Sequence, residues 1–114
     1  MASLRSLDQR VYPAAQALVR LLESAGVQVT VTSSRRDRDQ QQALYDRYKA
    51  GKSKYPAAPP GHSMHALGLA FDLHLSDPRY YELAGRAWEG IGGTWGGRFG
   101  DEIHFDARSL MRRV

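Results

Sequence analysis

The sequence has 114 residues, 42% of them hydrophobic and 25% charged, so it can bury one small core and has little room for a second module. No segment approaches the ~20 apolar residues that span a bilayer, and the first ten residues lack the apolar stretch of a secretion signal. We therefore expect one domain over residues 1–114, without membrane insertion. Lys and Arg outnumber Asp and Glu by 16 to 12, which favours anionic partners.

The first half of the chain predicts a helix, a strand and a second helix. Asp8 is placed to cap the first helix, whose first turn includes Pro13, where a missing N–H costs little. Alternating β-branched residues then predict a strand. The residues Asp-Arg-Asp-Gln that follow have the form of a capping box and open the second helix. The expected bounds are 8–25, 27–32 and 37–51.

The second half predicts two strands around a third helix. A loop with three prolines comes first, and Asp77 and Pro78 have the pattern of a cap and a first helical turn. Too few crossovers are available for a doubly wound sheet. We therefore expect an α+β domain with flanking helices and a small, mainly antiparallel sheet. The expected loop is 52–61, the strands are 67–75 and 102–105, the helix is 77–90, and a glycine-rich turn region covers 92–100.

Two imidazoles and one carboxylate stand out as candidate metal ligands. His65 and Asp72 lie at the entry and inside of one predicted strand, and His104 approaches from another. Three protein ligands with a fourth position open for water are the pattern of a catalytic zinc site, and the absence of cysteine excludes a thiolate structural site. His62 and His74 are competitors, because each is close in sequence to a candidate ligand.

Two carboxylates before His104 are candidates for a general base. In a regular strand Glu102 shares a face with His104, whereas Asp101 points away. Gly100, however, indicates a turn or bulge that would bring Asp101 to the metal side. The residues alone leave both candidates open.

Two features of the sequence could indicate surface functions, but each has a simpler structural interpretation. Trp88, Trp95 and Phe99 form a candidate platform for sugar stacking, but Trp88 is better suited to packing the third helix on the sheet and Trp95 to walling the site. The basic segment 35–47 also contains three aspartates, which is typical of a solvated helix face. No nucleic-acid partner is therefore expected.

These motifs resemble a zinc peptidase family that cuts peptidoglycan stem peptides. The family comprises D-alanyl-D-alanine carboxypeptidases and L-alanyl-D-glutamate peptidases, and it shares its fold with the hedgehog signalling domain. Its motif S-x-H-x-x-G-x-A-x-D is matched at every fixed position by the run from Ser63 to Asp72. The segments 95–105 and 32–45 are similar to its other motifs, T-S-G-Y-R ahead of Q-x-x-L-Y among them.

The resemblance implies a site with one zinc ion per chain. His65, Asp72 and His104 would be the ligands, and Asp101 would be the general base, contrary to the preference from strand geometry for Glu102. Arg36 would stabilise the developing oxyanion. Ser34 and Arg35 stand where the family has glycine and tyrosine, so that Arg35 is an alternative to Arg36. Ser63 is expected to contact the substrate.

The resemblance also implies a function. We expect hydrolysis of a peptidoglycan peptide, at the L-alanyl-D-glutamate bond, by a monomer of the compact endolysin type found in bacteriophages. Such a protein waits in the host cytoplasm until another protein opens the membrane. The alternatives are a D-alanyl-D-alanine carboxypeptidase or dipeptidase and, in a different class, a zinc-binding module of the same fold without catalytic activity.

Overall fold

The computed structural model describes residues 2–54 and 56–111 and has an α+β architecture. Four antiparallel strands form one sheet in the order β1-β2-β4-β3, which confirms the predicted fold class. Within the described residues, no helix is both long and apolar enough to cross a membrane. The strands are β1 Val29–Ser33, β2 Ala70–Leu75, β3 Thr94–Trp95 and β4 His104–Asp106; the helices are α1 Tyr12–Ser24, α2 Arg38–Lys49, α3 Tyr81–Gly90 and α4 Arg108–Met111; the short 3-10 helices are η1 Leu4–Ser6, η2 Pro60–His62, η3 Pro78–Tyr80 and η4 Gly96–Phe99.

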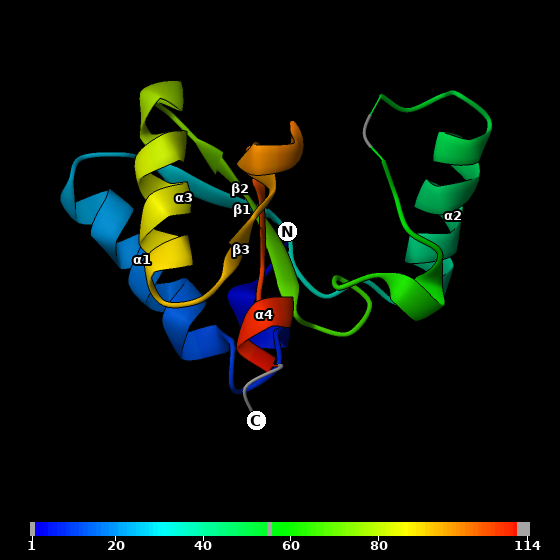
Figure 1. Ribbon diagram of the computed structural model, residues 1–114, viewed down its shortest axis with the longest axis horizontal. Coiled ribbons are helices and arrows are strands. Elements are labelled where there is room, and N and C mark those ends of the chain that lie inside the picture. Colours follow the sequence, from blue (N-terminus) through cyan, green and yellow to red (C-terminus); the bar gives the residue numbers. More distant parts are fainter. Residues whose placement is uncertain (1, 55, 112–114) are drawn as a thin grey trace.

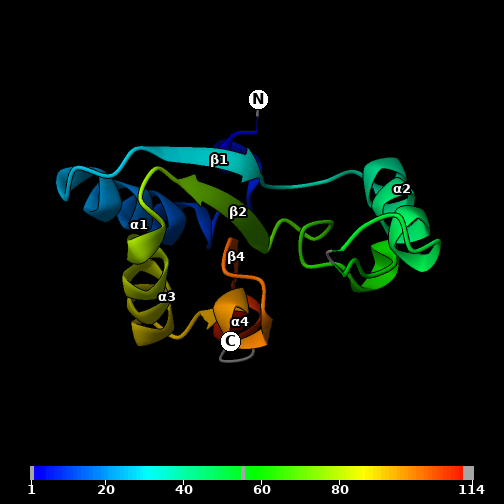
Figure 2. The ribbon, with the colours of Figure 1, turned by 90° about the horizontal axis from the view of Figure 1, so that it is seen from above.

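The hydrophobic core lies between one face of the sheet and the helices α1 and α3, which run beside each other in Figures 1 and 2. Alternate residues of β2 point into this core, and Phe71 stacks on Phe105 of β4, with ring centroids 5.5 Å apart. Because strand side chains alternate, Asp72 faces the opposite side of the sheet. That side is therefore available for a polar site.

The predicted helices are present, with corrections at the first and the third: Asp77 caps the 3-10 helix η3, and α3 itself begins at Tyr81. Tyr12 begins α1 with Pro13 in the first turn, as expected. Asp8 is not its cap, because its carboxylate accepts the N–H of Arg10 in a turn that precedes the helix. The capping box of α2 is present in full, with Asp37 and Gln40 each binding the other's backbone N–H.

The predicted strands are present but begin later than expected. β2 starts at Ala70 because the chain turns over residues 64–68, where Gly68 has a φ of +73°. The last strand starts at His104, and Thr94–Trp95 form an additional short strand inside the expected turn region. In the predicted loop 52–61, η2 begins at Pro60, and Tyr55 lies outside the described residues.

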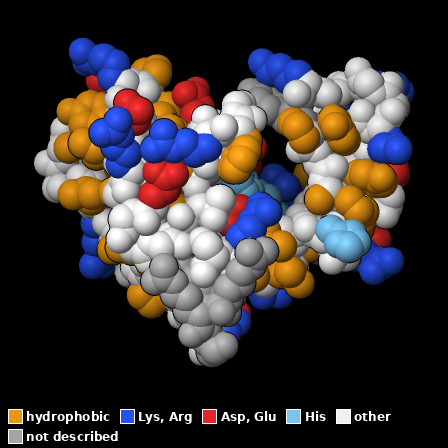
Figure 3. All heavy atoms as spheres, in the orientation of Figure 1, with side chains coloured by type: hydrophobic (Ala, Val, Ile, Leu, Met, Phe, Trp, Pro, Cys, Tyr) orange, Lys and Arg blue, Asp and Glu red, His pale blue; other side chains and the backbone are white. Residues whose placement is uncertain are grey.

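Helix α2 stands apart from the sheet and packs against η2 (Figures 1 and 2). Gln41 is its buried residue and donates from Nε2 to the carbonyl of Ala58, 2.8 Å away. Figure 3 shows the surface hollowed between the part of the molecule formed by α2 with η2 and the part formed by the sheet with α1 and α3. Histidine and cationic side chains lie at the bottom of this hollow. The polar face of the sheet opens into this hollow.

Candidate metal centre

His65, Asp72 and His104 come together on the polar face of the sheet. Asp72 and His104 are cross-strand partners in β2 and β4, so their side chains leave the sheet on the same side. His65 reaches them from the turn before β2, not from the strand itself as we expected. Asp72 Oδ1 lies 3.1 Å from His65 Nε2 and 3.2 Å from His104 Nδ1.

The separations fit a metal ion held by all three residues. One nitrogen or oxygen from each residue lies within 4.8 Å of the others. Zinc ligands at about 2.0–2.2 Å in tetrahedral geometry are roughly 3.3–3.6 Å apart, slightly more than the two distances above. His62 and His74 do not belong to this cluster, and His74 is exposed on the part of β2 that pairs with Thr30.

Outer hydrogen bonds orient the two imidazoles. His65 Nδ1 is 2.8 Å from the carbonyl oxygen of Ser34, which can only accept, so Nδ1 carries a hydrogen and Nε2 is the nitrogen turned toward Asp72. His104 has the opposite arrangement: Nε2 is 3.1 Å from the carboxylate of Asp106, and Nδ1 faces Asp72. Outer partners of this kind are usual for histidines that bind metals.

The charges at the centre favour a cation. Burial alone would raise the pKa of Asp72, but hydrogen bonds from His104 and His65 outweigh it and hold this pKa well below its usual range. Burial alone would lower the pKa of His104, but hydrogen bonds to Asp106 and Asp72 raise it to about 9. In the metal-free protein a proton on His104 thus takes the place that a metal ion would fill.

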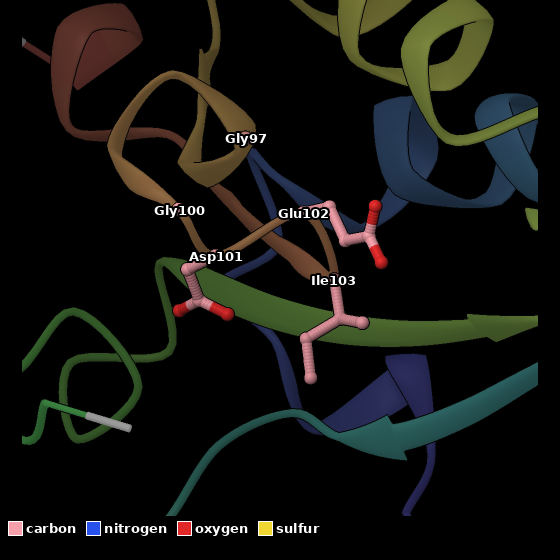
Figure 4. Close-up of a pocket in the computed structure, with 5 residues that line it drawn as sticks. All are labelled: Gly97, Gly100, Asp101, Glu102 and Ile103. Carbon is pink, nitrogen blue, oxygen red and sulfur yellow. The ribbon is translucent and has the colours of Figure 1, made fainter. Parts of the chain in front are cut away.

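Asp101 faces the metal centre and Glu102 does not. Residues 101–103 form a turn in which the N–H of His104 binds the carbonyl of Asp101, so strand alternation does not apply. Figure 4 shows the two carboxylates pointing to opposite sides. Burial raises the pKa of Asp101 above its usual value, although His104 opposes this, whereas Glu102 is exposed. A turn at Gly100 thus brings Asp101 to the metal side.

Arg36 reaches the centre, and Arg35 lies elsewhere. Nη2 of Arg36 is 3.3 Å from Oδ2 of Asp72, the oxygen that does not contact the histidines. The guanidinium of Arg35 instead donates to the carbonyls of Ser6 and Leu67. A register shift in β1 between Val31 and Ser33 precedes this segment, as β-bulges often do beside active sites.

Two further residues support the site: Gln41, to which the similarity with Q-x-x-L-Y gives no role, and Asp106, which the sequence motifs do not include. Gln41 accepts from Arg36 Nη1 at 3.2 Å, and thereby links α2 to the cation at the centre. Asp106 supports His104, and its position two residues later on a strand was the signal, because i and i+2 share a face. Ser63 is buried, and its hydroxyl accepts the N–H of Ala66 in the turn that carries His65. Its predicted contact with substrate stays a prediction.

The tryptophans serve the scaffold. Trp88 is buried, meets Phe71 edge-on and donates its indole N–H to the carbonyl of Asp106 at 2.8 Å. Trp95 is also buried and donates to the carbonyl of Glu102 at 2.9 Å, which supports the turn before His104. The sugar platform of three aromatic rings is therefore excluded, since Phe99 is the one exposed member.

The fold that carries this candidate centre is that of a peptidase family. The model of the VanY D-alanyl-D-alanine carboxypeptidase family matches residues 4–108. The chain belongs to this family. No curated protein sequence matches the chain significantly.

Solved structures have the same fold. A point mutant of the vancomycin resistance D,D-pentapeptidase VanY, from a VanB-type cassette and in complex with Zn(II), is 23% identical with a TM-score of 0.67, over 88% of this chain and 71% of that one. The D,D-dipeptidase VanXYg with a D-Ala-D-Ala phosphinate analogue is 26% identical with a TM-score of 0.64, over 88% and 49%. The L-Ala D-Glu endopeptidase ChiX of Serratia marcescens is 23% identical with a TM-score of 0.64, over 97% and 87%.

Proposed function

We propose that this protein is a zinc peptidase that hydrolyses the L-alanyl-D-glutamate bond of peptidoglycan. The observation that carries the proposal is the convergence of His65, Asp72 and His104 beside a half-buried carboxylate, Asp101, in a chain of the VanY family. Three neutral or anionic N and O ligands are the donor set of hydrolytic zinc sites.

Each residue of the centre has a role in amide hydrolysis. When bound by the three ligands, zinc would supply Lewis acidity toward the scissile carbonyl and lower the pKa of water. Asp101 would accept the proton of the attacking water and return it to the leaving amine, a role for which its raised pKa is suited. Arg36 would donate hydrogen bonds to the negative charge that develops on the carbonyl oxygen.

The openness of the site favours an internal bond over a terminal one. Burial raises the pKa of Asp101, the charge of Arg36 opposes this rise, and the oxyanion role already occupies that arginine. A D-alanyl-D-alanine carboxypeptidase must bind a terminal carboxylate as well as an oxyanion, and a carboxylate is commonly bound by a cation of its own. A hollow that is open at the surface (Figure 3) better suits a peptide that continues past the scissile bond.

Digestion of purified peptidoglycan by the zinc-loaded protein tests the proposal. Mass analysis should find new D-glutamate N-termini, and the Asp101→Asn variant should release none above background. Release of free D-alanine without a glutamate amine would assign the protein to carboxypeptidase activity. Release of neither product by a zinc-loaded, folded protein would make it a zinc-binding module without catalysis.

A further inference from the structure

Among the described residues, one local motif occurs three times: an aspartate that binds the arginine two residues later. Oδ1 of the aspartate accepts the arginine N–H, at 2.8 Å in Asp8-Gln9-Arg10, 3.0 Å in Asp77-Pro78-Arg79 and 3.1 Å in Asp106-Ala107-Arg108. In each case the guanidinium also folds back onto both carboxylate oxygens. The repeated geometry makes each carboxylate a fixed acceptor whose direction is set by its arginine.

The third motif differs from the others in burial and in its additional partner. The side chains of Asp8 and Asp77 are 23% and 26% exposed, whereas that of Asp106 is 0% exposed. Oδ2 of Asp106 accepts from Nε2 of His104 at 3.1 Å as well as from Nη2 of Arg108 at 2.7 Å. The indole N–H of Trp88 donates to the backbone carbonyl of Asp106.

We propose that Asp106, locked by Arg108, is the positioning residue that prepares His104 to bind the metal ion. The carboxylate of Asp106 accepts the hydrogen on Nε2 of His104, so that the Nδ1 lone pair is free for a metal ion held between His104 and Asp72. It also fixes the plane of the ring, which a metal ion in defined geometry requires. The inference rests on the metal site of the proposed function and adds a residue to it.

The Asp106→Asn substitution tests this role well because both carboxylate oxygens of Asp106 accept hydrogen bonds from Arg108. An amide has one acceptor and one donor atom. If the amide oxygen of the substituted side chain faces His104, the NH₂ group faces the backbone N–H and the Nε of Arg108. If the oxygen faces the other way, the NH₂ group faces His104 Nε2 and Arg108 Nη2. Either orientation places donors against donors, and the second favours the wrong tautomer of His104.

The test compares Asp106→Asn with Asp77→Asn, which breaks the same motif away from the metal. Zinc affinity, measured by competition with a chelator, should fall roughly 10- to 100-fold in Asp106→Asn and stay within about twofold of wild type in Asp77→Asn. Nitrogen NMR of the metal-free protein near pH 10 should find a larger fraction of His104 protonated on Nε2 in wild type than in Asp106→Asn, in which Asp72 is the carboxylate that still accepts from the ring. Wild-type zinc affinity and an unchanged tautomer in a folded Asp106→Asn variant would overturn the inference.

A second variant covers the case in which Asp106→Asn does not fold. Arg108→Ala keeps the carboxylate and removes its lock, so zinc affinity should fall, by less than in Asp106→Asn. An unchanged affinity and an unchanged tautomer in Arg108→Ala would then overturn the inference. If wild type binds no zinc, the proposed function loses its metal, while the tautomer of His104 still decides the role of Asp106.

Discussion

At the scale of single residues, Asp101 and Glu102 are adjacent acids with different surroundings. Asp101 lies in a turn near His104, Asp72, His65 and Arg36, and burial raises its pKa. Glu102 is exposed, and what the fold uses is its backbone carbonyl, which binds Trp95. Of these two neighbours in the chain, Asp101 is thus suited to proton transfer, whereas Glu102 contributes to the stability of the turn through its backbone.

Removing the charge of Asp101 should abolish most activity without loss of metal. Asp101→Asn keeps the size and shape of the side chain but cannot accept a proton, so kcat should fall by about 10²-fold or more. Zinc content and the unfolding midpoint should stay close to those of wild type. Glu102→Gln is the matched control and should retain nearly full activity. A larger loss in Glu102→Gln would mean that the turn is oriented differently in the active protein.

The stability of the metal-free protein should fall as the pH rises from about 6.5 to about 9. Hydrogen bonds to Asp106 and Asp72 outweigh burial and raise the pKa of His104 from 6.5 to about 9. Below pH 6.5 both states hold the proton and the stabilisation is complete; between the two values the unfolded chain releases a proton that the folded chain keeps, so stability is lost.

Urea unfolding of the metal-free protein at pH 6 and pH 9.5 measures this loss. We expect a decrease in the free energy of unfolding on the order of 2 to 3 kcal/mol. The decrease should be much smaller in His104→Gln, which cannot titrate. A wild-type stability that is constant or rises over this interval would contradict the charge state assigned to His104.

At the scale of elements, the sequence predicts the interiors of helices and strands better than their ends at the site. Apolar periodicity locates α1 and the capping box locates α2, whereas the cap Asp77 belongs to η3 and α3 begins at Tyr81. β2 and β4, however, begin three and two residues later than their sequence patterns indicate, because turns place His65 and Asp101. Such turns depend on contacts with distant segments, as in the bond from the N–H of Arg36 to the carbonyl of His65.

Gly96, the first residue of η4, packs directly against the turn before His104. A Cβ there would lie 2.4 Å from the carbonyl oxygen of Asp101 and 2.9 Å from Cβ of His104. A backbone oxygen cannot rotate away from such a contact as a side chain can, so the turn itself would have to move. Gly96→Ala should therefore destabilise the fold by about 1–3 kcal/mol. It should also weaken zinc binding, because Asp101 and His104 must move.

Gly90→Ala provides the control for this substitution. Gly90 is the last residue of α3, and a Cβ there meets nothing within 4 Å. Alanine is the better helix former, so this variant should be neutral or slightly more stable. Thermal unfolding of both variants measures the difference. Equal midpoints would show that the turn has room that the structure does not indicate.

At the scale of the whole molecule, the site exists because the helices cover unequal parts of the sheet. Helices α1 and α3 cover one face and bury the apolar residues of β2, while α2 stands apart and leaves the face with Asp72 beside a hollow (Figures 2 and 3). The sequence motifs identify Asp72 and His104 as residues of this face. They do not give the cross-strand register that brings His104 to Asp72 or the outer contacts of Gln41 and Asp106, which depend on tertiary packing.

Zinc content tests the central claim most directly. Protein purified with zinc should carry about one ion per chain, lose it to a chelator and regain it on addition of zinc. His104→Ala should lose the ion, because two ligands remain, whereas His74→Ala, outside the cluster, should bind it as wild type does. Full zinc occupancy in a folded His104→Ala variant would contradict the site described above.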